Sequence, residues 1–171
     1  MTPPEVLLQR VKGLLGADAL DGHAHCGDVT VLVPLERARE CLRRLKLDAE
    51  LAFNFLMDVT AVDYLGRNPR FELVYHLASI DAKPRDDQPS ALLHRLRVKT
   101  SVAESPCEAD SICALWDAAN WMEREVFDLY GIRFREHPDL RRILLYDEFK
   151  GHPLRKDYPK ERRQPLIGPR N

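Results

Sequence analysis

Glutamate, histidine and cysteine side chains are the groups of this chain whose types could do chemistry. Glu123 and Glu125 form the pair that most resembles a catalytic acid and base. They lie in a segment with helical spacing, and two positions along a helix place side chains about 200° apart. The two carboxylates therefore cannot flank one scissile bond, which excludes a two-carboxylate hydrolase built on this pair.

His23, His25 and Cys26 resemble a fragment of a metal site. In a strand, a spacing of two puts both imidazoles on one face, but zinc also needs a fourth ligand and supporting groups. Neither is visible nearby in the sequence. We therefore interpret the three residues as surface or packed side chains near a hairpin turn.

Cofactor-binding patterns are also missing. An iron–sulfur cluster usually needs four convergent thiolates, whereas the four cysteines (Cys26, Cys41, Cys107 and Cys113) contain no C-x-x-C pair. No G-x-G-x-x-G or G-x-x-x-x-G-K-[ST] loop occurs, so no dinucleotide or phosphate loop is recognisable. We predict no catalytic, cofactor-binding or metal-ligating residue in this chain.

Length and composition describe one folded domain, or one domain with an appendage. The 171 residues are 44% hydrophobic and 31% charged, a globular and not a disordered composition. No window approaches 18 consecutive apolar residues, and the first residues do not read as a signal peptide. We expect contact with a membrane only through a partner. The net charge of -1 gives no global reason to expect nucleic-acid binding.

The hydrophobic pattern predicts an α+β body over residues 1–131, an antiparallel sheet covered by helices. A helix is expected at about residues 4–15, a hairpin turning at 26–28 into a strand at 29–33, and a second helix after Pro34. Three strands follow, with a loop at 81–89 before the last. Their expected inner faces are Phe53, Phe55, Met57, Val59 and Ala61 in the first, Phe71, Leu73, Tyr75 and Leu77 in the second, and Leu92, Leu96, Val98 and Val102 in the third.

Apolar residues recur at helical spacing between Ser111 and Tyr130, and Gly131 is a natural left-handed cap. Trp121 lies opposite this apolar stripe, amid charged residues, which favours a binding face. The alternative is an indole lying on its own helix or under the tail. Glu123 lies inside the stripe, so we expect an arginine partner from Arg141, Arg142 or Arg155. The alternative is a carboxylate at the edge of the stripe that reaches water.

Residues 132–171 are predicted to form an extended tail. Residues 150–171 contain seven basic and two acidic residues, a net charge of +5, and four prolines that oppose regular structure. Such a segment is expected to lie along the surface of a partner. RNA binding through the basic residues is an alternative of another class.

Three sequence runs resemble the signature of a known family. They are Glu123-Arg-Glu-Val-Phe-Asp-Leu-Tyr-Gly-Ile-Arg-Phe134, His137-Pro-Asp-Leu-Arg-Arg-Ile-Leu144 and Gly151-His-Pro-Leu-Arg-Lys-Asp-Tyr-Pro159. They look like the C subunit, the 30 kDa subunit family, of the proton-pumping NADH–quinone oxidoreductase (respiratory complex I). The same family covers related subunits of membrane-bound hydrogenases. The preceding body has the length and order of elements that the family shows, but the long C-terminal extension of some members is nearly absent.

The resemblance implies a subunit without a redox centre in the hydrophilic arm, peripheral on the cytoplasmic side of the bacterial inner membrane. Its expected partners are the quinone-reducing D subunit and neighbouring Fe–S subunits, and no nucleic acid. NADH, FMN, Fe–S clusters and quinone are implied only for the assembled complex. The equivalent subunit of a membrane-bound hydrogenase is the alternative within the same architecture.

The residues expected at the partner interface, or in the motif that shapes it, come from the last helix and the tail. They are Trp121, Glu123, Arg124, Glu125, Asp128, Tyr130, Gly131, Phe134, His137, Pro138, Leu140, Arg141, Arg142, Leu144, Gly151, Pro153, Leu154, Arg155, Lys156, Asp157, Tyr158 and Pro159.

Overall fold

A computed structural model describes residues 3–81, 92–161 and 164, and it has the predicted α+β class. The expected loop at 81–89 lies outside the described residues except for its first residue, as do positions 162, 163 and 165–171 of the tail. The N-terminal helix α1 spans Pro4–Leu15, as predicted, and buries Leu7, Val11 and Leu15. Pro4 suits its first turn because a proline lacks only an amide that has no helical partner there.

Five strands form the main sheet, in the order β1-β2-β5-β4-β3. Their bounds are β1 Asp21–His25, β2 Asp28–Leu32, β3 Phe55–Asp63, β4 Phe71–Ile80 and β5 Leu92–Val102. Every neighbouring pair is antiparallel except β2 and β5, which run parallel. The expected antiparallel sheet is therefore confirmed for most of the sheet, and the β2–β5 pair departs from it. A parallel pair needs a crossover, and here α2 (Ala38–Leu47), β3 and β4 lie between the two strands in the sequence.

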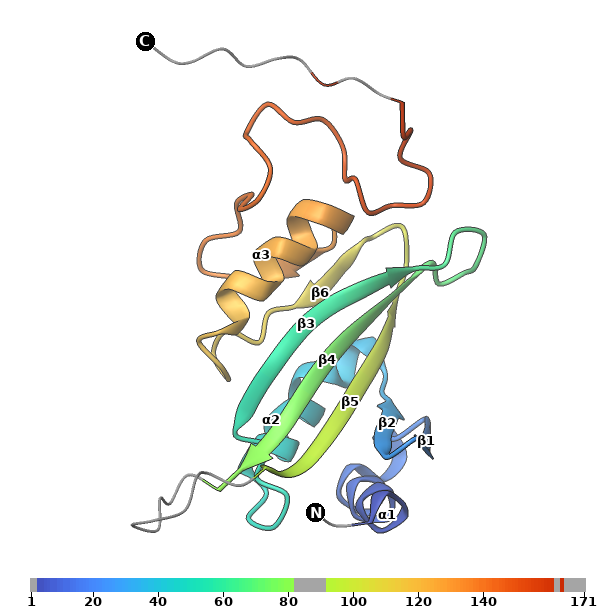
Figure 1. Ribbon diagram of the computed structural model, residues 1–171, viewed down its shortest axis with the longest axis vertical. Coiled ribbons are helices and arrows are strands. Elements are labelled where there is room, and N and C mark those ends of the chain that lie inside the picture. The colour runs from blue at the N-terminus through green and yellow to red at the C-terminus, as the bar shows by residue number, and fades with distance from the viewer. Residues whose placement is uncertain (1–2, 82–91, 162–163, 165–171) are drawn as a thin grey trace.

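The helices cover one face of this sheet, and α2 lies behind it in the view of Figure 1. The core lies between these layers, where Cys41, Leu42 and Leu45 of α2 join the inner side chains of the strands. The inner face of β4 is as predicted, since Phe71, Leu73, Tyr75 and Leu77 are all at most 1% exposed. Cys41, also fully buried, is a small core residue of α2.

The alternation predicted for β3 and β5 is broken near one end of the sheet. An irregularity between Leu56 and Asp58 shifts the register of β3 against β4, so Leu56 points into the core. Phe55 and Met57, expected inside, are 50% and 45% exposed. A similar shift opposite Ile80 leaves Leu92 41% exposed instead of buried. A β-bulge inserts one extra residue, and the simple alternation of inward and outward side chains fails across it.

A second, two-stranded sheet was not predicted. β6 (Glu108–Asp110) and β7 (Arg133–Arg135) pair in parallel, and α3 (Ala119–Tyr130) lies between them in the sequence. The helix expected from Ser111 begins only at Ala119, and residues 111–118 form turns instead. The prediction was too long because the buried Ile112 and Trp116 in these turns fall at helical spacing. Gly131 ends the helix with φ +76°, as predicted. The division of the chain at residue 131 stays a prediction; beyond it, Ile132 and Phe134 are buried in the core.

Mutations can test which side chains near the bulge in β3 point into the core. Leu56→Ala should lower the free energy of unfolding by about 2–5 kcal/mol, because it removes a buried side chain. Phe55→Ala and Met57→Ala should each change it by less than about 1 kcal/mol, since both side chains are half exposed. Urea titration measures all three. Large losses at positions 55 and 57 with none at 56 would contradict the register described here.

Candidate partner interface

Glu123 is a buried carboxylate held by groups that precede its own helix. Its side chain is fully buried and accepts hydrogen bonds from the Ile112 amide (2.7 Å) and the Ser111 hydroxyl (2.7 Å). The Cys113 thiol lies 3.4 Å from the same carboxylate. The expectation of an arginine partner is therefore wrong. Backbone and hydroxyl donors satisfy this carboxylate and fix the turns before α3.

Burial raises the pKa of the Glu123 carboxyl above its ordinary value, and the hydrogen bonds from Ile112, Ser111 and Cys113 offset this only in part. The side chains of Cys113, Glu123 and His137 offer donor atoms within 4.8 Å of one another, a spacing that could hold a metal ion. The bonding of His137 opposes this use. Its Nδ1 accepts from the Asp139 amide (3.0 Å), so Nε2 carries the proton and donates to the Asn120 carbonyl (3.1 Å). Burial also raises the pKa of the Cys113 thiol to about 11, which disfavours the thiolate that a metal needs.

His23, His25 and Cys26 are all exposed at the β1–β2 hairpin. Among the described residues, the donor atoms that lie close enough together to hold a metal ion belong to Cys113, Glu123 and His137. The three hairpin residues are not part of this group.

Asp128 organises the tail. One carboxylate oxygen accepts hydrogen bonds from three consecutive amides, those of residues 143, 144 and 145, at 2.9–3.1 Å. The other oxygen accepts from the Arg142 guanidinium at 2.6 Å. Burial alone would raise the pKa of Asp128, but these bonds outweigh it and hold the pKa below its ordinary value. The Asp128 side chain is completely buried.

The tail also caps the C-terminal end of α3. The last carbonyls of a helix have no partner within it. Here the Tyr130 carbonyl accepts from Arg155 Nε (2.5 Å) and the Leu129 carbonyl from the Leu154 amide (3.1 Å). A Cβ atom at Gly131 would lie 2.5–2.7 Å from side-chain atoms of His152 and Arg155, so any larger residue would have to displace them, and φ +76° also favours glycine here.

A cluster of charges attaches the distal tail to the sheet. Arg70, 3% exposed, pairs with Asp63 (2.7 Å) at the end of β3 and with Asp157 (2.7 Å) in the tail. Glu104 lies 2.6 Å from the same guanidinium, and the Lys156 amide donates to Asp63 at 2.7 Å. The Arg70 hydrogen bonds lower the pKa of both Asp63 and Asp157. The cluster therefore ties residues that are 87 and 93 positions apart in the chain.

Arg124 lies beneath Trp121. Its guanidinium donates to the carbonyls of Arg141 (3.1 Å) and Arg142 (3.2 Å) and is centred 5.3 Å from the indole ring. Arg124 is 7% exposed, whereas Trp121 is 63% exposed. The sequence correctly placed Trp121 outward, and its partner-binding role stays a prediction.

The other residues expected at the interface divide into buried and exposed groups. Those that are buried or partly buried are Tyr130, Gly131, Phe134, His137, Leu140, Arg142, Pro153, Arg155 and Tyr158. Those that are exposed are Glu125, Pro138, Arg141, Leu144, Gly151, Leu154, Lys156, Asp157 and Pro159. Leu144 and Leu154 are 61% and 49% exposed, so the tail leaves apolar side chains on its surface.

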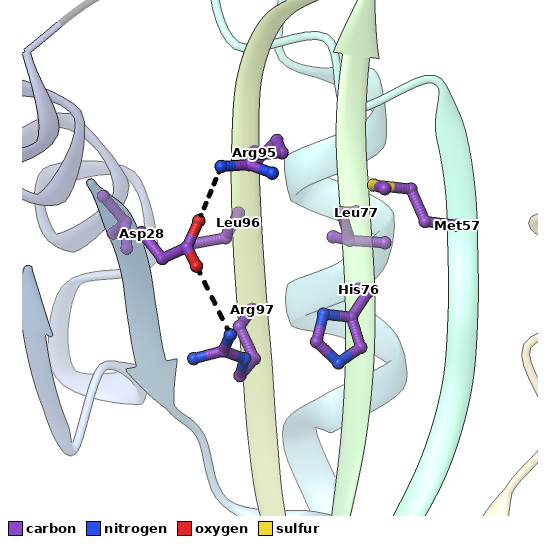
Figure 2. A pocket seen from close by; sticks show the side chains of 8 residues that line it. Asp28, Met57, His76, Leu77, Arg95, Leu96 and Arg97 are labelled. Atoms are coloured by element: carbon purple, nitrogen blue, oxygen red, sulfur yellow. Dashed lines mark ion pairs between the residues drawn. The ribbon is translucent and has the colours of Figure 1, made fainter. Parts of the chain in front are cut away.

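The sheet carries a separate hollow on its outer face, with a volume of about 200 Å³ (Figure 2). The Asp28 carboxylate lies between two arginines, 3.0 Å from Arg95 and 3.6 Å from Arg97. His76 and Met57 line the other side. Because Asp28 compensates much of the arginine charge, this hollow is a weak candidate for an anion site.

Sequence reasoning missed Asp63, Arg70 and Ser111. One signal for Asp63 was available, because it follows the inward positions Val59 and Ala61 at a spacing of two. An acidic residue at an inward position needs a partner. Nothing in the local sequence identified Arg70 as that partner.

Asp128→Asn should release the segment that its carboxylate holds. It removes the charge that pairs with Arg142 and weakens the acceptor of three amides, so we expect a loss of about 3–5 kcal/mol in the free energy of unfolding. Amides 143–145 should lose protection in hydrogen exchange. Asp139→Asn is the control, because its pair with Arg141 is exposed and should contribute at most about 1 kcal/mol. Equal effects of the two variants would contradict the role of Asp128.

Glu123→Gln should change the pH dependence of stability. Folding raises the pKa of this carboxyl, so the folded chain binds its proton more tightly than the unfolded chain does. The resulting stabilisation is fully present below the unfolded pKa, about 4.3, and is lost as pH rises through the folded pKa. Unfolding free energies measured from about pH 4 to pH 7 should therefore fall for the wild type relative to Glu123→Gln. The exposed Glu125→Gln is the control, and parallel wild-type and Glu123→Gln profiles would refute the expectation.

Comparison with known proteins places this arrangement in a family. The family model described as respiratory-chain NADH dehydrogenase, 30 Kd subunit, matches residues 31–164. The C subunit of NADH-quinone oxidoreductase from Citrifermentans bemidjiense is 51% identical over 140 residues, 82% of this chain and 80% of that protein. The protein of the same name from Geobacter metallireducens is 48% identical, over 88% of this chain and 86% of its own length.

Solved structures agree with these relatives. A trypsin-resistant fragment of Nqo5 is 34% identical with a TM-score of 0.62, and the match covers 80% of this chain and 98% of the fragment. A chain of the membrane-bound sulfane sulfur reductase, an archaeal respiratory membrane complex, is 22% identical with a TM-score of 0.74, over 92% of this chain and 86% of that one. At this identity the second likeness concerns the fold alone.

Within residues 3–81, 92–161 and 164, no helix combines the length and the apolar character that crossing a bilayer requires. The family resemblance inferred from the three sequence runs is confirmed by the matches over most of the chain. The chain belongs to the family of the 30 kDa subunit of respiratory-chain NADH dehydrogenase, that is, of the C subunit of NADH-quinone oxidoreductase.

Proposed function

We propose that this chain is a non-redox structural subunit of the peripheral arm of NADH–quinone oxidoreductase. It docks on the quinone-reducing D subunit, beside the Fe–S subunits, through its last helix and tail. In this position it supports electron transfer from NADH through FMN and Fe–S centres to quinone, coupled to proton translocation. The chain itself holds none of these cofactors and is peripheral, on the cytoplasmic side of the bacterial inner membrane.

One observation carries the proposal: the last helix and the tail have a defined conformation, yet they leave large apolar side chains exposed. Asp128, Arg155 and the Arg70 cluster attach it to the body. Trp121 and Leu144 nevertheless remain 63% and 61% exposed. A preformed apolar surface is what a permanent partner needs, because little ordering entropy is lost on docking.

The polar interior supports a structural role over a catalytic one. The buried carboxylates described above are saturated by amides, hydroxyls or arginines of the same chain. A catalytic group needs an accessible reacting atom, and Glu123 and Asp128 are both fully buried.

Purification of the tagged full-length chain from native membranes tests the proposal. Mass spectrometry should identify the quinone-reducing subunit and Fe–S subunits in stoichiometric amounts. Asp128→Asn should reduce this recovery, because it loosens the segment that carries Leu144, whereas Asp139→Asn should not. A chain recovered alone, with ribonucleoprotein, or with a nickel–iron subunit would refute the proposal, and the last two results would support the RNA-binding or the hydrogenase alternative.

A further inference from the structure

Trp121 projects from α3 between two opposite charges. With about 100° per residue, Arg124 lies about 60° to one side of Trp121 around the helix and Glu125 about 40° to the other. Residues three and four positions apart are neighbours on a helix surface, so both charges border the indole. The exposed indole therefore has a cation on one side and an anion on the other.

The cation on one side is buried without a counter-ion. The Arg124 guanidinium is bound by two backbone carbonyls and the indole, and no carboxylate of the described residues lies within 4.0 Å of it. By contrast, the buried Arg70 is paired with Asp63, and the buried Asp128 is paired with Arg142. Covering Trp121 would remove the remaining water near Arg124, and a buried charge is costly unless it is compensated.

The anion on the other side is exposed, and it has no ion pair with any residue that the structure describes. Glu125 differs in this from Arg141, whose exposed guanidinium already pairs with Asp139 at 2.9 Å. A surface that covers Trp121 would therefore meet one cation and one anion that no described residue of this chain compensates.

We infer that Trp121 inserts into an apolar socket of a partner protein, whose rim carries a carboxylate on the Arg124 side and a basic side chain on the Glu125 side. The inference rests on the proposed function, since that partner is the neighbouring subunit of the complex. The indole supplies the buried area, and aromatic side chains of this kind dominate binding energy at interfaces. The two charges set the direction in which the partner lies across the helix, because a reversed orientation would bring like charges together.

Competition inside one cell tests the inference. Wild-type and variant full-length chains with different tags are expressed together, and their ratio in the assembled complex is measured. Trp121→Ala should be under-represented by about thirtyfold, the ratio that corresponds to loss of an interface hot spot. Glu125→Lys should be under-represented by about tenfold. Its deficit should grow when the isolated complex is washed at an ionic strength at the low end of the physiological range, because salt then screens the repulsion between like charges less.

Two matched variants control for exposure and charge. Leu47→Ala removes an apolar side chain that is 64% exposed on α2. Glu50→Lys reverses a charge that is 77% exposed, and the exposed pair of Glu50 with Arg10 (3.6 Å) contributes little to folding. Both should enter the complex at a ratio near one. Thermal midpoints of the isolated Trp121→Ala and Glu125→Lys chains should equal that of the wild type, which separates docking from folding.

The outcomes distinguish the inference from the proposed function on which it rests. If wild-type chains are absent from the complex, the proposed function fails and this inference fails with it. If wild-type chains enter the complex and Trp121→Ala enters equally well, only the socket is refuted. If Trp121→Ala is excluded but Glu125→Lys and Glu50→Lys behave alike, the inferred arrangement of charges around the socket is wrong.

Discussion

Two buried carboxylates on α3 hold the C-terminal third of this chain together. Glu123 and Asp128 are five positions apart, which places them about 140° apart around the helix. Glu123 therefore faces the turns that precede the helix and Asp128 faces the tail that follows it. Each carboxylate accepts hydrogen bonds from backbone amides of irregular segments. These amides lack the carbonyl partners that a helix or a sheet would provide. These bonds hold the turns at residues 111–112 and the tail segment at residues 142–145 against the helix.

The distribution of polar groups fits a protein that contributes shape to a complex. Its buried charges, including Arg70 and Asp63, connect segments that are distant in the sequence. Apolar side chains remain outside at the tail and at the end of the sheet where the β-bulges lie. Exposed apolar surface of this kind is typical of binding sites on soluble proteins, which supports the proposed docking role.

Arg124 and Arg142 show how similar groups acquire different roles through their acceptors. Arg142 meets the Asp128 carboxylate and closes a contact within the chain. Among the residues that the structure describes, Arg124, which binds the same tail segment, meets only carbonyls and an indole. A carboxylate neutralises the charge of a guanidinium and forms a stronger hydrogen bond with it than a neutral carbonyl does. The Arg142–Asp128 pair stabilises the fold, whereas the charge of Arg124 can be compensated by a carboxylate of a neighbouring protein.

Local sequence determined the elements whose signals are themselves local. Proline and hydrophobic spacing define α1, glycine at residue 131 ends α3, and strict alternation in β4 identifies its buried face. The family also followed from sequence, because its signature runs are contiguous. Only the tertiary structure decided the bulges that turn Phe55 and Leu92 outward, the pairing of β6 with β7, and the donors that satisfy Glu123. Each of these depends on groups that meet through tertiary contact, and a buried carboxylate accepts amides as readily as it accepts the arginine that its sequence context suggested.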